Sequence, residues 1–393
     1  MEEVPKRIPE TLQISPYLYI KNEEYRGMLR RLGLIRQRKR ICDYRNSRHV
    51  PSGAAFLRLF EGCRFPARTA DISRRYALSE AGLRDLLDCG FLVDPAEAWK
   101  ATRISTVEIE ISTRCNWRCR YCPVSLDPKP PATMDMNLFR DILDKAQKHQ
   151  TVRAVQFDAY NEPALEEHFE DRVRLLAETR LKLRLYTNGS VLDEKKINLL
   201  KDTEVLEFVR FNLPSNDEEI FREMTGSPML KQTLRNIDHA VSRGLPVELS
   251  IQGSEEEIAR NIGALKRRFG PIAANEYRAM RRQNVTTDRA GAVSQGRYRK
   301  DVHVAGLLAG CRLPLTVVVI SIHGDLYLCC EDYYQRNVFG NIRDGSLEEV
   351  MSGPKAERLR RQVFGAETAP DDFICRNCGH MKQAVERKKR DEG

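Results

Sequence analysis

Strand-like and helix-like segments alternate through the middle of the chain. Runs rich in β-branched and apolar residues predict strands at 107–112, 155–160, 183–187, 206–212 and 247–251. Segments with helical periodicity accompany them at 137–149, 167–180, 193–201, 217–224, 230–243 and 255–268. Because strands and helices that alternate at this spacing form a parallel sheet covered by helices, the sequence predicts an α/β domain over residues 102–300.

Three cysteines follow the first of these strands. Cys115, Cys119 and Cys122 have the spacing CxxxCxxC, and seven of the 11 cysteines in the chain fall into tight clusters. Clustered cysteines in a chain of this kind indicate metal or redox chemistry rather than disulfides. Three thiolates can hold a four-iron cluster and leave one iron open to an outside molecule. The alternative, a structural zinc site, normally takes four protein ligands.

At this motif the chain resembles the radical SAM superfamily. The resemblance implies a partial (β/α)6 barrel whose chemistry lies at the carboxyl ends of the strands. It also implies a 4Fe-4S cluster on the three cysteines, with S-adenosylmethionine (SAM) bound at the open iron. Glu162 corresponds to the glutamate of the family's Gly-Gly-Glu-Pro-like motif, which holds the methionine ammonium, although Tyr160 and Asn161 replace the two glycines.

By the same resemblance, further residues contact SAM at the ends of the strands. Tyr121, just before the third cysteine, matches the position whose backbone meets the adenine. The remaining candidates for the cofactor site are Asn188, Asn212, Ser215 and Gly253.

A second set of cysteines lies near the end of the chain. Residues 301–393 resemble a SPASM or twitch domain, which binds auxiliary iron–sulfur clusters, and the cysteines that carry the likeness are Cys311, Cys329, Cys375 and Cys378. No cysteine follows Cys378, so the resemblance implies one fully ligated auxiliary 4Fe-4S cluster, with a four-cysteine zinc site as the alternative. Cys330 could replace Cys329, but neighbouring side chains on a strand point in opposite directions, so only one of them should reach the cluster.

The first part of the chain, residues 1–98, predicts a small separate unit. Helices at 52–60, 67–76 and from Ser79 to about residue 88, followed by a strand at 91–93, describe a winged helix, while residues 36–41 fit either a strand or a helix end. The unit resembles the recognition elements that bind precursors of ribosomally made, modified peptides. A structural cap and a DNA-binding role remain alternatives.

Charge and hydropathy limit the partners. The formal net charge is +9, and six of these charges lie in residues 1–100, which suits an acidic partner such as a peptide or an electron carrier but also fits solvated arginine-rich faces. No apolar run approaches bilayer length and the start lacks a signal-peptide core, so we expect a cytoplasmic protein without a membrane partner. Nucleic acid is the least favoured partner.

The two cysteine sets and the resemblance imply a function. Reduced by a flavodoxin or ferredoxin, the first cluster would split SAM into methionine and a 5′-deoxyadenosyl radical that takes a hydrogen atom from the substrate. We expect oxidative modification of a ribosomal precursor peptide, by a crosslink, a thioether or a dehydrogenation. The alternatives are a dehydrogenase or epimerase of a small molecule such as an amino sugar or nucleoside, and an iron–sulfur or zinc DNA-binding regulator. The sequence names no catalytic acid or base.

Overall fold

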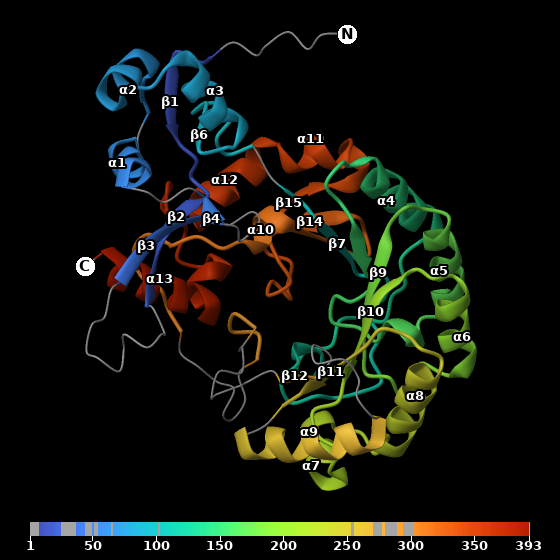
Figure 1. Cartoon of the computed structure of the whole chain (residues 1–393). Coiled ribbons are helices and arrows are strands. Elements are labelled where there is room, and N and C mark those ends of the chain that lie inside the picture. Colours follow the sequence, from blue (N-terminus) through green and yellow to red (C-terminus); the bar gives the residue numbers. More distant parts are fainter. Residues whose placement is uncertain are drawn as a thin grey trace.

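A long curved sheet forms the centre of the chain (Figure 1). The computed structural model describes residues 8–24, 37–43, 49–50, 54–63, 66–100, 103–252, 255–269, 277–279, 289–293 and 302–392. Within these residues the sheet has nine strands in the order β12-β11-β10-β9-β8-β7-β13-β14-β15. Every neighbouring pair from β7 to β12 is parallel. These strands are β7 (Thr106–Ile109), β8 (Ala154–Gln156), β9 (Lys182–Thr187), β10 (Leu206–Asn212), β11 (Val247–Ile251) and β12 (Tyr277–Ala279).

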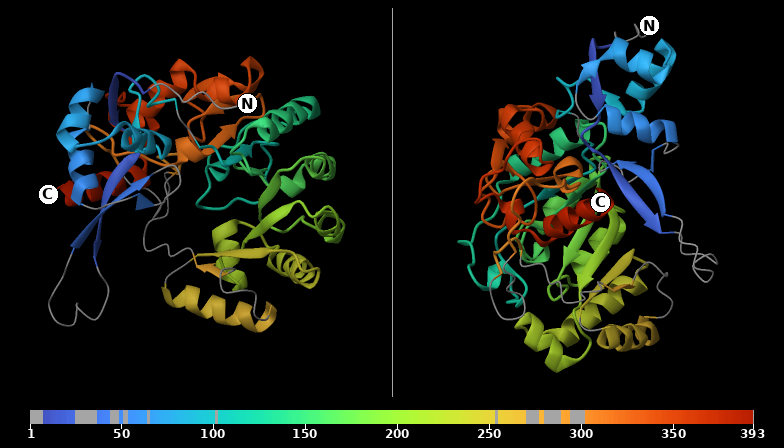
Figure 2. Two further views of the ribbon diagram at one scale, coloured as in Figure 1. Left: turned by 45° about the horizontal axis from the view of Figure 1, so that its top comes forward. Right: turned by 90° about the vertical axis from the view of Figure 1, so that its left-hand side faces the viewer.

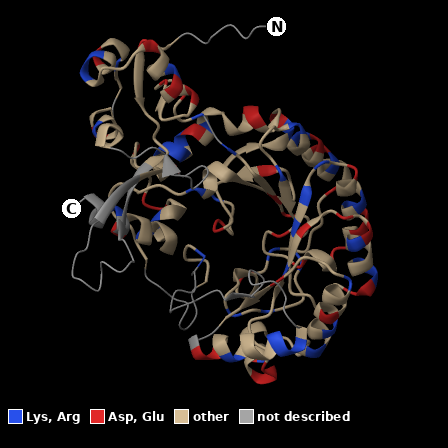
Figure 3. Cartoon of the chain, viewed as in Figure 1, with Lys and Arg blue, Asp and Glu red and all other residues tan. Residues whose placement is uncertain are grey.

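Helices lie along the outer side of this arc, as Figure 1 shows. They are α4 (Met136–Lys148), α5 (Phe169–Ala177), α6 (Glu194–Asp202), α7 (Glu218–Thr225), α8 (Leu230–Ser242) and α9 (Glu255–Phe269). Asp135, Asp193 and Asp217 cap α4, α6 and α7 by accepting hydrogen bonds from first-turn amides. Their outer faces carry interspersed charges of both signs (Figure 3), as expected for solvated surfaces.

The expected parallel α/β architecture is therefore present. Two strands are shorter than the sequence predicts: β7 ends at Ile109 rather than at residue 112, and β8 ends at Gln156 rather than at residue 160.

The C-terminal residues continue the same sheet. Strand β13 (Val317–Ile320) lies parallel to β7, and β14 (Asp325–Tyr327) and β15 (Val338–Asn341) follow it in antiparallel pairs. The helices of this part are α10 (Leu313–Thr316), α11 (Leu347–Met351), α12 (Pro354–Val363) and α13 (Gly379–Glu392). Across the described parts of the chain, none of the helices combines the length and apolar character that a bilayer crossing requires.

The described N-terminal residues form two small antiparallel sheets and three helices. One sheet joins β1 (Thr11–Ile14) to β5 (Ala67–Arg68) and β6 (Leu92–Val93), and the other joins β2 (Leu18–Glu24), β3 (Gln37–Asp43) and β4 (His49–Val50). The helices are α1 (Ala54–Gly62), α2 (Thr69–Tyr76) and α3 (Glu80–Asp88). The hydroxyl of Ser79 caps α3, accepting from the Gly82 amide at 3.1 Å. Of the two possibilities for residues 36–41, the strand is correct from residue 37 onward.

An aromatic cluster joins this N-terminal unit to the C-terminal residues. The ring centroid of Tyr17 lies 5.9 Å from that of Trp99 and 5.2 Å from that of Phe364, and both pairs meet edge to face. The Tyr17 hydroxyl and the buried Arg360 guanidinium both donate to the carbonyl of Trp99, at 3.1 and 2.7 Å. Strand β2 contacts α13, and both views in Figure 2 show these two elements near each other. The unit is therefore packed on the C-terminal region rather than tethered by a linker alone.

Candidate functional site

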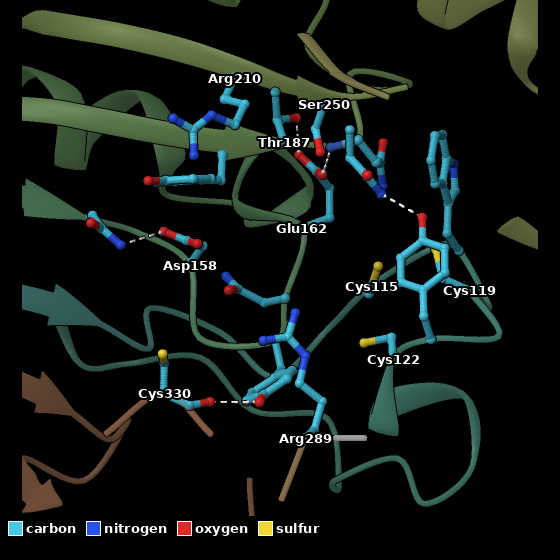
Figure 4. Close-up of a pocket in the computed structure, with 18 of the residues that line it drawn as sticks. Cys115, Cys119, Cys122, Asp158, Glu162, Thr187, Arg210, Ser250, Arg289 and Cys330 are labelled. Atoms are coloured by element: carbon cyan, nitrogen blue, oxygen red, sulfur yellow. Dashed lines mark hydrogen bonds between the residues drawn. The ribbon is translucent and has the colours of Figure 1, made fainter. Parts of the chain in front are cut away.

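A cavity of about 380 Å³ lies at the carboxyl ends of the parallel strands. The ends of β7, β8, β9 and β10, together with the loops after the first three, supply most of its wall, because parallel strands bring their carboxyl ends to one edge of the sheet. Figure 4 shows the side chains that surround it. The cavity is the natural place in this fold for a bound cofactor and a substrate.

The three cysteines of the first motif line this cavity together. In Figure 4, Cys115, Cys119 and Cys122 gather on one side of it. The loop that carries them is fixed by backbone bonds to the end of α7, where Arg118 N–H donates to the Thr225 carbonyl at 2.9 Å. An additional turn holds the third cysteine, whose amide donates to the Cys119 carbonyl at 3.0 Å.

The environment of these thiols fits a metal cluster. Burial raises the pKa of the Cys115 thiol to about 12 and raises the pKa of Cys119 and Cys122 as well. A thiol in such a place is a poor thiolate by itself, whereas iron stabilises the deprotonated form that binds it. The indole N–H of Trp117, which also lines the cavity, is buried and has no hydrogen-bond partner among the described residues. Soft donors and a spare N–H match a 4Fe-4S cluster with SAM beside it.

Glu162 lies in the wall of the same cavity and is buried. Its carboxylate accepts hydrogen bonds from Thr187 Oγ1 and from the Asn188 amide, both at 2.6 Å, and from the Ala164 amide at 3.1 Å. Burial raises the pKa of Glu162 to about 7 although these hydrogen bonds oppose the shift. Among the described residues no Lys, Arg or His forms an ion pair with Glu162, and a buried carboxylate in this situation suits a ligand ammonium.

The loop before Glu162 has a backbone conformation typical of glycine, although Tyr160 occupies the position. Tyr160, which stands where the family motif has glycine, has φ of +68°, a left-handed conformation that is costly for a bulky residue. Its hydroxyl donates to the Cys330 carbonyl at 2.5 Å, and its ring meets that of Tyr333 edge to face at 5.0 Å. These contacts hold the strained residue in place.

The turn after β9 and the end of β10 also reach the cavity. Asn188 Nδ2 donates to Asn116 Oδ1 at 2.8 Å, and Asn188 Oδ1 accepts from the Ser190 hydroxyl at 2.7 Å. Asn212 Nδ2 donates to the hydroxyl of Tyr121 at 2.9 Å, and both side chains line the cavity. The structure thus brings Tyr121, Glu162, Asn188 and Asn212 together with the three cysteines.

One predicted cofactor residue, Ser215, is placed differently, and another cannot be located. Ser215 is buried in the turn before α7, where its hydroxyl accepts from the Asp217 amide at 3.1 Å, and its side chain is not in the cavity wall. Gly253 lies outside the described residues. The neighbouring Gln252 lines the cavity and places its Nε2 3.5 Å from Asn212 Oδ1.

The C-terminal cysteines gather in a separate apolar region. Cys311, Cys375 and Cys378 pack in one buried cluster with Leu328 and Phe373. Burial raises the pKa of all four candidate thiols, and charge interactions that join Cys375 to Cys311, Cys329 and Cys378 add to the rise. In the described part of the chain, no three His, Cys, Asp or Glu side chains are arranged to hold a single metal ion. A four-iron cluster spreads its ligands more widely, and four converging soft donors fit it.

Cys330 faces the first cavity rather than this second cluster of cysteines. Its side chain lines the cavity on the side away from the three cysteines (Figure 4), and its pKa is raised by burial and by Glu108. Burial raises the pKa of the Cys329 thiol, and the nearby charges of Cys330 and of Cys375 add to the rise. The side chains of Cys329 and Cys330 therefore point in opposite directions, as expected for adjacent residues.

Sequence reasoning missed several polar residues of the cavity. They are Glu108, Gln156, Asp158, Tyr186, Arg210, Ser250 and Arg289. Glu108 and Glu110 alternate with apolar residues in and after β7, and this alternation was the available signal for a polar side chain facing the site. Arg289 follows a stretch without periodic pattern, so its place in the wall had no comparable signal.

Comparison with known proteins supports this arrangement. Residues 109–268 match the model of the radical SAM superfamily, and residues 311–379 match the model of an iron-sulfur cluster-binding domain, SPASM. The S-adenosyl-L-methionine-dependent 2-deoxy-scyllo-inosamine dehydrogenase of Niallia circulans is 21% identical over 285 residues, which cover 72% of this chain and 95% of that enzyme.

Two solved structures share the fold. BtrN in complex with AdoMet and 2-DOIA superposes with a TM-score of 0.51 at 19% identity, over 71% of this chain and 94% of that one. Streptococcus suis SuiB bound to its precursor peptide SuiA superposes with a TM-score of 0.50 at 14% identity, over 94% of both chains.

An open α/β sheet with cysteines at its carboxyl edge, followed by a cysteine-bearing C-terminal segment, defines an iron–sulfur enzyme. The chain carries a radical SAM domain and, after it, a SPASM domain. It is a radical SAM enzyme, with SAM and 4Fe-4S clusters as its cofactors.

Proposed function

We propose that this enzyme oxidatively modifies a ribosomally made precursor peptide, by a crosslink, a thioether or a dehydrogenation. The observation that carries the proposal is the N-terminal unit. The likeness to SuiB, a protein solved with a precursor peptide, extends over 94% of this chain, whereas the likeness to BtrN extends over 71%. A substrate that needed only the cavity would leave the extra unit without a role.

The N-terminal unit would act as a winged-helix recognition domain for the leader of the peptide. Its strands β2, β3 and β4 form a three-stranded sheet whose edges could accept a further strand. The aromatic cluster of Tyr17, Trp99 and Phe364 fixes the unit to the C-terminal residues. A leader bound there would be tethered to the enzyme, which raises the effective concentration of the core peptide near the cavity.

The residues of the cavity would hold SAM. Glu162 would take the methionine ammonium, Tyr121 the adenine, and Asn188, Asn212 and Gly253 further polar groups of the cofactor. When bound, SAM and its cluster supply a 5′-deoxyadenosyl radical, which removes a hydrogen atom from an unreactive carbon. The chain contributes orientation and exclusion of water.

The C-terminal cysteines support an oxidative outcome. Cys311, Cys329, Cys375 and Cys378 would hold an auxiliary 4Fe-4S cluster, which supplies a one-electron acceptor when bound. With such an acceptor present, we favour net oxidation over the return of a hydrogen atom. A flavodoxin or ferredoxin would be the reductant of the first cluster, and the net positive charge of +9 suits an acidic donor.

The experiment uses the full chain, reconstituted anaerobically with iron and sulfide. It is incubated with SAM, a reductant and a peptide encoded beside its gene, and the products are separated by mass spectrometry. We expect release of 5′-deoxyadenosine together with peptide that has lost two hydrogen atoms, and no conversion of the same peptide without its leader. Unchanged peptide from every neighbouring short reading frame, despite release of 5′-deoxyadenosine, would contradict the proposal.

A second candidate function is the dehydrogenation of a small molecule. The Niallia circulans dehydrogenase matches over 95% of its own length, so its whole chain has a counterpart here. Conversion of amino sugars or nucleosides under the same conditions, without any peptide, would favour this function.

A further inference from the structure

Two carboxyl groups, one buried and one partly buried, lie close together in the cavity wall. Glu108, on β7, is only 6% exposed, and Asp158 follows the end of β8. The side-chain amide of Gln156 lies between them, with Nε2 3.5 Å from Glu108 Oε2 and 3.4 Å from Asp158 Oδ1. These long contacts to a single amide are a weak compensation for a buried and a partly buried carboxyl group.

The cations of the cavity are engaged elsewhere. Arg210 pairs with Glu248, its Nε 2.7 Å from Oε2, and Arg289 pairs with Glu331 at 2.9 Å. Each of these arginines is therefore paired with a carboxylate outside the pair, although the charge of Arg289 still lowers the pKa of Glu108 and that of Arg210 still lowers the pKa of Asp158. Among the described residues, no Lys, Arg or His side chain lies within ion-pair distance of Glu108 or Asp158.

Two negative charges on this pair are unfavourable. Burial raises the pKa of both carboxyl groups well above the usual range, and the nearness of Asp158 adds to the rise for Glu108. Like charges that share a dry site resist ionising together. A cation placed between them would remove both the repulsion and much of the desolvation cost.

The position of the pair separates it from the SAM-binding groups. In Figure 4, Asp158 and Cys330 lie on the side of the cavity away from Cys115, Cys119 and Cys122, and Glu162 lies between the two sides. The loop from Asp158 to Glu162 is also held in a strained form, with Tyr160 at φ of +68°. Strain that neighbouring contacts maintain in a cavity wall is typical of a built binding site.

We propose that Glu108 and Asp158 bind a cationic group of the substrate, a primary ammonium or a guanidinium, and so orient it in the cavity. This inference rests on the proposed function and deepens it, because it names the chemistry of the substrate. A lysine or arginine side chain of a peptide and the ammonium of an amino sugar share this chemistry. The pair is a recognition site, and no proton or electron transfer is assigned to it.

The test measures binding without turnover. The full chain, reconstituted anaerobically and saturated with SAM but given no reductant, is titrated in a calorimeter with matched probes. Two are cationic residue amides, N-acetyl-lysinamide and N-acetyl-argininamide, and N-acetyl-norleucinamide is their neutral counterpart. Glucosamine and glucose form the corresponding pair of sugars. We expect at least one cationic probe to bind about tenfold or more tightly than its neutral partner, a difference of about 1.4 kcal/mol.

The variants localise that preference. Glu108→Gln and Asp158→Asn keep the size of each side chain, and each should remove most of the preference for the cation. Glu207→Gln is the matched control, since Glu207 lies on the same sheet but pairs with Arg184 outside the cavity. The SAM affinity of each variant serves as the test of folding, because the single substitutions leave the cysteines and Glu162 in place.

The outcomes divide clearly. Preference for a cationic amide supports a peptide side chain, and preference for glucosamine over glucose supports an amino sugar. Equal binding or no binding of charged and neutral probes in wild type overturns the inference, as does a preference that survives both substitutions. None of these measurements uses a reductant or a precursor peptide, so failure of the peptide to be modified would leave them unaffected.

Discussion

Cys329 and Cys330 are consecutive residues whose side chains serve different parts of the protein. The thiol of Cys329 interacts with Cys375 in the C-terminal cluster, whereas the thiol of Cys330 lines the cavity near Glu108 and Arg289. One residue is thus available to an auxiliary iron–sulfur cluster and the other to the substrate.

This difference predicts the iron content of two variants. Replacing Cys329 by Ser should remove a ligand of the auxiliary cluster and lower the iron bound after reconstitution by about four atoms per chain. Cys330→Ser is the matched control and should keep the iron of the wild type. Iron and sulfide analysis of both variants makes the comparison, and equal losses would show that the assignment of the two thiols is wrong.

Substitution of Glu162 should act on SAM binding. Glu162→Gln keeps the shape of the side chain but removes the charge that we assign to the methionine ammonium. We expect SAM to bind about tenfold to a hundredfold more weakly, since charge-assisted hydrogen bonds contribute about 1.5–3 kcal/mol. Equilibrium binding of SAM measures the change. An unaltered dissociation constant would remove Glu162 from the cofactor site.

The same carboxyl group predicts how SAM binding depends on pH. Burial raises the pKa of Glu162 to about 7, and the ammonium of SAM needs the ionised form. Below pH 7 binding must first remove a proton, so the affinity should fall by up to about tenfold per pH unit. Titrations from about pH 6 to 8 test this, and Glu162→Gln should have a flatter profile. A wild-type profile as flat as that of the variant would contradict the assignment.

Without SAM, the stability of the protein should change with pH in the opposite direction to the SAM affinity. Because the folded-state pKa of Glu162 is above its ordinary value, the folded protein binds more protons than the unfolded chain at mildly acid pH. The contribution of this group to stability is therefore present at low pH and lost as the pH rises through about 7.

Gly189 provides a test of the turn that supports Glu162. Its φ is +74°, and an added Cβ would lie 2.5 Å from Cδ1 of the buried Phe211. Gly189→Ala should lower the free energy of unfolding by about 2–4 kcal/mol, through backbone strain and overpacking together. Gly244→Ala is the control, because Gly244 has φ of +69° but an added Cβ there would meet open space. This substitution should lower the free energy of unfolding by only about 1–2 kcal/mol. Urea unfolding compares the two, and equal losses would refute the role of Phe211.

The fold was predictable where the pattern is local. The parallel strands and outer helices follow from apolar runs and helical periodicity, and the start of α3 at Ser79 can be read from the sequence. The spacing of Cys115, Cys119 and Cys122 was enough to predict that they meet, because a short loop after a strand allows little else.

The substrate side of the cavity was not predictable in the same way. The sequence pattern identifies Glu108 only as part of a strand. Its role in the cavity depends on Asp158, which follows the neighbouring strand β8. Arg289 reaches the wall from a distant part of the chain, and Ser215 caps a turn instead of facing the cavity. Such placements depend on tertiary packing, which no local signal contains.

The central claim is that three thiolates hold a cluster with one iron open to SAM. Electron paramagnetic resonance of the anaerobically reconstituted and reduced Cys311→Ala, Cys375→Ala, Cys378→Ala variant isolates the first cluster. We predict a 4Fe-4S signal that shifts when SAM is added and a further loss of that signal when Cys115, Cys119 and Cys122 are also replaced. A signal that SAM leaves unchanged, or protein that binds no iron at Cys115, Cys119 and Cys122, would contradict the account.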